Sequence, residues 1–199
     1  MDGATTSRLN EERLDLKEVV KEVFDGLRFA AGQQFSFREE YIGDTILFCD
    51  KSRLSTVLRN IIGNSVKYQR KGIDNPEVFV RFENLPNKYK ISISDNGEGI
   101  PAESQQKVFD MFYRGTSTAN GSGLGLYICK EMLEKMNARY SISSTPGQGT
   151  SFSISFSKKN LQGSKEAGRS TNPAMNQSQL QLKDSLNKLS GFQSINQAG

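Results

Sequence analysis

Three polar side chains recur at helical spacing in the segment NIIGNSVKY. Asn60 and Asn64 are four residues apart and Lys67 follows three residues later, so one face of a helix would carry all three. Two carboxamide oxygens and an ammonium group on one face could hold a hard cation and the phosphates attached to it. An Asn-rich solvated face with a lysine at its end is the alternative, and this segment alone leaves both open.

A second candidate site lies in ISISDNGEGI, where a strand-like alternation ends on an acid. The Asp95 carboxylate can accept a hydrogen bond from an exocyclic amine. Gly97 and Gly99 would let a flat ring approach the backbone with no Cβ in the way. These features predict a binding site for a purine base. An ordinary turn after the strand uses the same residue types and is the alternative.

The third candidate is the glycine-rich segment GSGLGL, which ends a loop and opens a predicted helix. Closely spaced glycines before a helix N-terminus expose backbone N–H groups to an anion, and the helix dipole adds to the attraction. The segment is not a dinucleotide fingerprint, because Leu126 stands where the third glycine would be, and it has no Gly-Lys-Ser/Thr of a P-loop. Gly121, Gly123 and Gly125 are therefore predicted to form a phosphate cradle.

The composition excludes several other chemistries. The 199 residues include no histidine, which rules out histidine-activated nucleophiles, histidine general bases and histidine-ligated zinc within this sequence. Cys49 and Cys129 lie far apart in apolar segments, which predicts two free buried thiols in a reducing compartment. The formal charge of +4 comes without basic runs interleaved with aromatics, so a nucleic-acid partner is not indicated. Without an apolar signal segment or membrane span, a cytoplasmic location is expected.

Helical and strand-like periodicities alternate along the chain and indicate which elements position the three candidate sites. The predicted helices cover residues 15–32, 50–72 and 124–136, and the predicted strands lie within 35–48, 77–95 and 140–157. Clustered antiparallel strands with helices between them indicate a two-layer α/β sandwich, in which helices cover one face of a mixed, mostly antiparallel sheet.

Three regions are expected along the chain. Residues 1–13 would be a lead-in or linker, and residues 14–158 would form one folded domain. Residues 159–199 are rich in Asn, Gln and Ser, a composition typical of a disordered tail.

The order of these motifs carries a family resemblance that covers roughly residues 14–158. NIIGNSVKY resembles an N-box, DNGEGI a first glycine box, FDMF an aromatic F-box, GSGLGL a second glycine box and GQGTSF a closing Gly-Thr segment. The chain thus resembles the ATP-binding catalytic domain of sensor histidine kinases. That family shares the Bergerat-type fold with DNA gyrase, heat-shock chaperones and mismatch-repair ATPases.

The resemblance implies roles for matching residues. Asn64 would ligate Mg²⁺, and Asn60 would assist it. Lys67 and Arg114 would contact phosphate. Asp95 would accept a hydrogen bond from the adenine amine of ATP. The other residues implied to contact or shape the nucleotide are Tyr68, Gly97, Gly99, Ile100, Phe112, Gly121, Ser122, Gly123, Leu124, Gly125, Leu126 and Thr150. A lid would run from about Tyr113 to Gly121.

The implied partners are a dimerisation domain that bears the acceptor histidine, in the parent chain or in trans, and a downstream response regulator. The domain alone would be monomeric, and its parent could be anchored in the inner membrane. An ATP-hydrolysing relative would carry a glutamate near Asn60 as a general base, so hydrolysis by this chain is expected to be slow. A nucleotide-binding regulatory scaffold and an anti-sigma-type serine kinase stay open as alternatives.

Overall fold

The computed structural model describes residues 9–31, 35–114 and 122–158, which belong to one folded unit, Met1–Leu161. Predicted features at Gly32, in most of the lid and in the tail from 159 lie outside these residues. The helices are α1 (Leu16–Ala31), α2 (Lys51–Lys67) and α3 (Gly125–Lys135), with short 3₁₀ turns at Ala102–Ser104 and Lys107–Phe109. The strands are β1 (Glu11–Asp15), β2 (Ser36–Ile42), β3 (Ile46–Asp50), β4 (Glu77–Asn84), β5 (Lys88–Asp95), β6 (Arg139–Thr145) and β7 (Gly149–Ser157).

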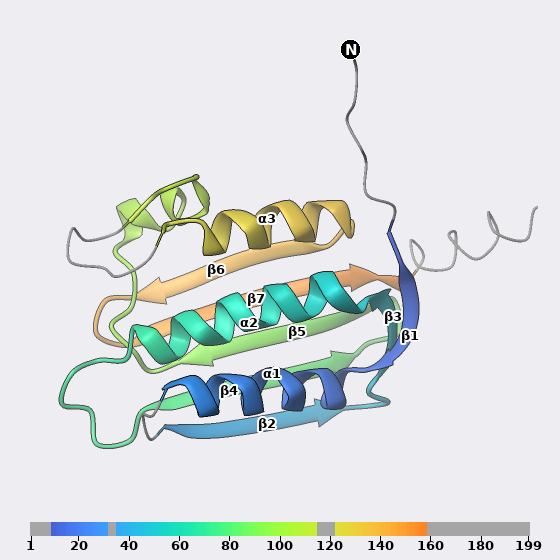
Figure 1. Cartoon of the computed structure of the whole chain (residues 1–199), viewed down its shortest axis with the longest axis horizontal. Helices are drawn as coiled ribbons and strands as arrows, with labels where there is room; N and C mark the ends of the chain where they lie inside the picture. Colours follow the sequence, from blue (N-terminus) through green and yellow to red (C-terminus); the bar gives the residue numbers. More distant parts are fainter. Residues whose placement is uncertain (1–8, 32–34, 115–121, 159–199) are drawn as a thin grey trace, which may run out of the picture. The chain divides into compact units, whose positions relative to one another are not determined.

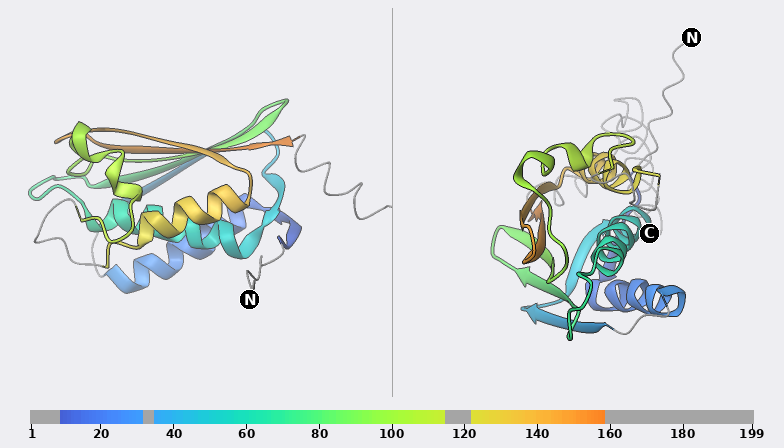
Figure 2. Two further views of the ribbon diagram at one scale, coloured as in Figure 1. Left: turned by 90° about the horizontal axis from the view of Figure 1, so that it is seen from above. Right: turned by 90° about the vertical axis from the view of Figure 1, so that its left-hand side faces the viewer.

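A five-stranded sheet with the order β2-β4-β5-β7-β6 forms one layer of the fold. β2 and β4 are parallel, and the other neighbouring pairs are antiparallel. α1, α2 and α3 lie side by side over one face of this sheet (Figure 1), and the edge-on view in Figure 2 shows all three on the same side. The predicted two-layer α/β sandwich with a mixed sheet is confirmed.

The core lies between the helices and the covered face of the sheet. Every second residue of the central strands is buried, as the alternation predicted. α2 contributes the largest helical share, and its stripe of Leu, Val and Ile side chains repeats every three or four residues. The buried strand residues are Val78, Val80, Phe82, Ile91, Ile93, Phe152, Ile154 and Phe156, and those of the α2 stripe are Leu54, Val57, Leu58, Ile61, Ile62 and Val66.

A second, two-stranded sheet joins β1 to β3 in antiparallel register, with Glu11 opposite Asp50 and Asp15 opposite Ile46. The sequence indicates no strand here, and residues 11–13 fall in the expected lead-in. Only Leu14 of β1 is buried, so the strand has almost no apolar alternation by which it could be recognised. Its pairing anchors the chain immediately before α1.

The predicted helix over 50–72 is shorter in the structure. It begins as predicted after Asp50, whose side chain accepts a hydrogen bond from Arg53 N, and it ends at Lys67 because Tyr68 leaves the helical region with φ −99° and ψ 34°. The Tyr68 carbonyl then accepts from Glu98 N at 2.9 Å, so it serves the loop after β5 instead of another helical turn. None of the helices among the described residues is long and apolar enough to cross a membrane.

Candidate functional site

A cavity of about 400 Å³ opens where the C-terminal half of α2, the end of β5 and the N-terminus of α3 meet. Its volume is in the range of small-molecule sites, which combine apolar walls with a few placed polar groups. The apolar part of its lining is formed by Ile61, Ile93, Ile100, Val108, Leu126, Ile142 and Phe152.

Most of the predicted site residues line this one cavity, although they are spread from position 64 to position 150 of the sequence. They are Asn64, Lys67, Tyr68, Asp95, Gly99, Ile100, Arg114, Ser122, Gly123, Gly125, Leu126 and Thr150. Asn60, Gly97, Phe112 and Leu124 are described but do not line it, and Gly121 lies outside the described residues. The three candidate sites of the sequence are therefore parts of a single site.

Asp95, at the end of β5, is the polar group beside the apolar wall. Its Oδ1 accepts from the backbone N–H groups of Gly97 and Thr150, both at 3.0 Å. Among the described residues, both hydrogen bonds to this carboxylate end on Oδ1, which leaves Oδ2 to accept from a ligand. Two backbone bonds on one oxygen fix the plane of the carboxylate, so Asp95 is a preorganised acceptor.

The glycines after Asp95 make room for the backbone of two neighbouring segments, a role that the sequence did not predict. A Cβ on Gly97 would lie 2.5 Å from the Tyr68 carbonyl oxygen. Gly99 has φ +71°, and a Cβ there would overlap the carbonyl of Thr145 in the β6–β7 turn. These glycines position the loop against two neighbouring segments. Gly99 still borders the cavity, whereas Gly97 does not.

The C-terminal turn of α2 supplies the polar groups on another side of the cavity. Lys67 Nζ donates to the Tyr68 hydroxyl at 3.1 Å and lies 4.8 Å from the centre of its ring, which holds the ammonium group beside the opening. Asn64 borders the cavity one turn earlier. Among the described residues no group of three or more Cys, Asp or Glu side chains could hold a metal ion.

Asn60 has a packing role in the structure. Its Nδ2 donates to the Thr56 carbonyl at 2.9 Å, and a Cβ on Gly125 would lie 2.9 Å from Asn60 Oδ1. Asn60 thus sits against the first residue of α3, and the glycine there lets the two helices approach. This contact sets where the N-terminus of α3 enters the site.

The N-terminus of α3 faces the cavity without a side-chain cap. Leu124 occupies the cap position and makes no capping bond with its side chain, so N–H groups of the first turn can bind an anion. Gly123, with φ +71°, approaches the backbone of Phe112 and Tyr113. The segments on either side of residues 115–121 therefore come together at the cavity. Phe112 itself is 63% exposed and does not line it.

Several residues that help to build the site belong to none of the sequence motifs. Ser144 Oγ accepts from Ile100 N at 2.8 Å, and Gln105 Nε2 donates to the carbonyls of Ile100 and Ser144 at 3.0 and 2.8 Å. Tyr113 donates to Ser104 Oγ at 2.9 Å beside the cavity. Serine and glutamine are common in loops, so nothing in the sequence distinguishes these side chains from solvated ones.

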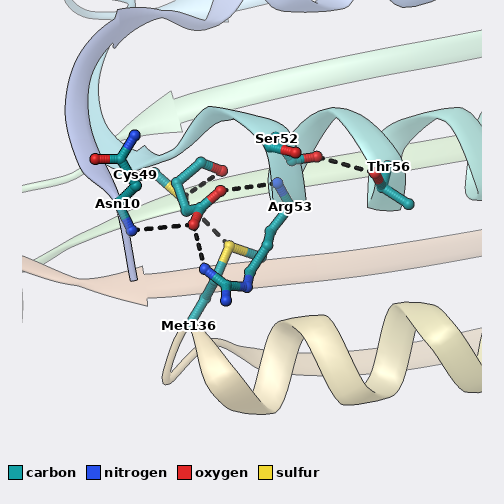
Figure 3. A network of polar contacts seen from close by, with 7 residues as sticks. Asn10, Cys49, Ser52, Arg53, Thr56 and Met136 are labelled. Atoms are coloured by element: carbon teal, nitrogen blue, oxygen red, sulfur yellow. Dashed lines mark hydrogen bonds and ion pairs between the residues drawn. The ribbon is translucent and has the colours of Figure 1, made fainter. Parts of the chain in front are cut away.

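The opposite end of α2 is fixed by a buried ion pair between Asp50 and Arg53, shown in Figure 3. Asp50 is 5% exposed and also accepts from Asn10 N at 3.1 Å. Burial alone would raise the pKa of its carboxyl, but hydrogen bonds from Arg53 N and Asn10 N and the Arg53 charge outweigh it and lower the pKa. The network ties the segment before β1 to the helix that carries Asn64 and Lys67.

The two cysteines are free and buried, as predicted. Burial raises the pKa of each thiol to about 12, so neither is a thiolate at neutral pH. Cys49 packs against Met136, with its Sγ 3.5 Å from the methionine sulfur (Figure 3). These thiols have a structural role in the core.

The model of the family described as "Histidine kinase-, DNA gyrase B-, and HSP90-like ATPase" matches residues 49–160, more than half of the chain. The chain belongs to this ATPase family. Among curated relatives of this ATPase domain, the sensor protein kinase WalK of Staphylococcus haemolyticus is 35% identical over 156 residues. That match covers 76% of this chain and 25% of the relative. WalK of Staphylococcus aureus is 33% identical over 155 residues, 76% of this chain and 37% of that protein. The chain thus spans only 25% to 37% of the length of these relatives.

Solved structures of sensor kinases share the fold of this ATPase domain. The mycobacterial sensor histidine kinase MprB is 26% identical with a TM-score of 0.64, and the match covers 74% of this chain and 97% of that one. The Acinetobacter baumannii histidine kinase AdeS is 25% identical with a TM-score of 0.62, covering 75% and 68%. Full-length ShkA, solved in complex with AMPPNP, has the same fold at 22% identity, with a TM-score of 0.63 over 77% of this chain and 32% of that one. The predicted family and fold are confirmed, and the chain holds an ATPase-type catalytic domain of the kind found in sensor histidine kinases.

Proposed function

We propose that this domain binds Mg-ATP in the cavity and presents the γ-phosphate to a histidine on a separate dimerisation domain of a two-component sensor kinase. The observation that carries the proposal is the polarity of the cavity. A fixed carboxylate, Asp95, lies beside an apolar wall, and an uncapped helix N-terminus with Lys67 and Arg114 lines the same space. The AMPPNP complex of ShkA supports a nucleotide as the ligand of this fold.

The base would lie at the Asp95 end. Asp95 Oδ2 would accept from the exocyclic amine of adenine, and the apolar side chains around it would pack on the faces of the ring. The loop that contains Gly97, Gly99 and Ile100 holds Asp95 in place, since Gly97 N donates to it directly. Tyr68, 39% exposed at the rim, would flank the nucleotide.

The phosphates would lie at the α3 end. The first backbone N–H groups of α3 and the loop from Ser122 to Gly125 would donate to phosphate oxygens, and the helix dipole would favour their charge. Lys67 and Arg114 also line the cavity and would neutralise more of that charge.

The donor set fits a Mg²⁺ ion that arrives with the nucleotide. Mg²⁺ keeps several waters and phosphate oxygens and needs few protein ligands, and the Asn64 carboxamide can supply one. Asn60, which packs on α3, would assist by fixing the position of the α3 N-terminus relative to Asn64. When bound, the ion would neutralise charge on the phosphates; the residues of this chain orient them.

Phosphoryl transfer needs little covalent chemistry from the protein. An imidazole nitrogen would attack the γ-phosphorus, the bond to the bridging oxygen would break, and ADP would leave; positioning and charge neutralisation supply most of the rate. The chain has no histidine, so the acceptor must come from another segment or another protein. Asn60 and Asn64 cannot take a proton from water, so hydrolysis should be slow.

We also propose where the domain works and which protein it works with. Residues 14–158 would form the catalytic domain, working in the cytoplasm whether or not its parent protein is anchored in a membrane, and a response regulator would receive the phosphoryl group from the histidine domain. The isolated domain would be a monomer.

Transfer can be tested with the purified chain, γ-labelled Mg-ATP and a separately purified two-helix domain that carries the acceptor histidine. Acid-labile, base-stable label on that domain is expected, absent when the histidine is replaced by alanine or when the chain carries Asn64→Ala. ATP binding without any label would favour a regulatory scaffold instead. Acid-stable label on a serine would favour a serine kinase of the anti-sigma type.

A further inference from the structure

Ser144 lies just outside the cavity, on β6, yet it contacts three groups that shape the Asp95 end. Ser144 pairs with Thr150 in the register of β6 and β7. Its Oγ accepts from Ile100 N at 2.8 Å, lies 2.8 Å from the Gly149 carbonyl oxygen and lies 2.9 Å from Thr150 Oγ1. One hydroxyl thus joins the loop after Asp95 to the start of β7.

A proton inventory assigns direction to these three hydrogen bonds. A serine hydroxyl has one proton to donate and can accept two bonds. The Gly149 carbonyl can only accept, and Ile100 N–H can only donate. All three contacts are satisfied together only if Ser144 donates to Gly149 and Thr150 donates to Ser144.

This assignment determines what Thr150 offers to a ligand. Because its single proton is given to Ser144, the Thr150 hydroxyl has only lone pairs left for the cavity that it lines. Its backbone N–H is also committed, since it donates to Asp95 Oδ1 at 3.0 Å. The cavity therefore presents two neighbouring acceptors, Asp95 Oδ2 and Thr150 Oγ1, and no donor from either residue.

We propose that Ser144 is a positioning residue that fixes the Thr150 hydroxyl as an acceptor and so helps the site to select a purine that carries an amino group at its 6-position. A 6-keto purine would place an oxygen against two acceptors and leave them unpaired. Gln105 supports the arrangement, because its Nε2 donates to the carbonyls of Ser144 and Ile100 and holds both backbones. This inference rests on the proposed nucleotide site and specifies its base selectivity.

The test is the ratio of the dissociation constants for ATP and inosine 5′-triphosphate, whose bases differ at the 6-position. In Ser144→Ala, the Thr150 proton is released and can turn toward a keto oxygen. The preference for ATP should fall about tenfold, the discrimination that one neutral hydrogen bond supplies. Ser144→Thr keeps the hydroxyl and should keep the preference. Ser143→Ala, on the exposed side of the same strand, is the matched control.

A merely structural role of Ser144 would weaken both nucleotides equally and leave their ratio unchanged, and that result would overturn the inference. A second check uses Thr150→Val, which removes the hydroxyl that Ser144 is said to orient. In that background Ser144→Ala should leave the ratio where it is, whereas a further tenfold change would show that Ser144 acts by another route. If the unmodified chain bound neither nucleotide, the proposed function and this inference would both fail. If the unmodified chain preferred ATP and Ser144→Ala preferred it to the same degree, only the inference would fail.

Discussion

Replacing Asp95 with asparagine changes one acceptor of the site with little change of shape. The asparagine can keep its oxygen toward Gly97 N and Thr150 N, the two groups that donate to Oδ1 in the structure. Its amide NH₂ then occupies the place of Oδ2 and faces the base. The variant should therefore fold normally and be altered only in what it offers to the ligand.

The expected loss follows from two contributions. The charge-assisted hydrogen bond to the adenine amine contributes about 1.5–3 kcal/mol to binding. In the variant the new side-chain amide and the adenine amine are both donors, which leaves a buried polar group unpaired at a cost of about 1–3 kcal/mol. Taking about 3–4 kcal/mol for both, ATP should bind about 10²–10³-fold more weakly. Inosine 5′-triphosphate has a 6-keto oxygen that the new amide can satisfy, so it should lose much less.

Calorimetric titration of both proteins with both nucleotides measures these changes, and thermal unfolding checks that the variant is folded. Asp74→Asn makes the same change of net charge at an exposed position outside the cavity and should bind like the unmodified chain. ATP affinity within about threefold of the original in Asp95→Asn, or an equal loss for both nucleotides, would refute the assignment of Asp95 as the base-reading group.

Three further predictions follow from other parts of the structure. Lys67→Met should weaken ATP about tenfold or more but leave adenosine binding unchanged, because Lys67 would contact phosphate and not the base; equal losses in titrations with the two ligands would contradict this. Gly99→Ala should lower the free energy of unfolding by about 2 kcal/mol or more in urea melts, because the φ of Gly99 is +71° and a Cβ there meets the Thr145 carbonyl. The control Gly72→Ala, at an exposed position, has no such overlap, so its free energy of unfolding should fall only by the cost of its positive φ. Folding lowers the pKa of Asp50, so this carboxylate stabilises the fold above its unfolded pKa, near 3.9, and the stabilisation is lost as the pH falls through the folded pKa. The stability advantage over Asp50→Asn should therefore shrink below about pH 4, and an advantage independent of pH would argue against the ion pair.

The sequence was sufficient to predict the site where residue type and spacing directly encode geometry. Asn64 and Lys67 share a helix face because of the helical repeat, and Asp95 ends a strand whose alternation is plain. Their convergence with Gly123 and Gly125 followed from motif order, through the family resemblance. No local rule brings residues from α2, β5 and α3 to one cavity.

Other features depend on tertiary contacts that a single sequence does not display. Tyr68 ends α2 because its carbonyl is used by Glu98, a contact that is distant in sequence. β1 is too polar to be recognised and is set by its pairing with β3. The close approach of Asn60 to Gly125, a contact between α2 and α3, could not be read from the sequence either.

The most direct test of the nucleotide site is a calorimetric titration of the unmodified chain with ATP, with and without Mg²⁺, and with inosine 5′-triphosphate as the competitor base. We predict one site per chain that prefers ATP and weakens when Mg²⁺ is removed. Failure to bind ATP in either condition, or equal affinity for the two nucleotides, would contradict the account of a cavity built around Asp95 to read adenine.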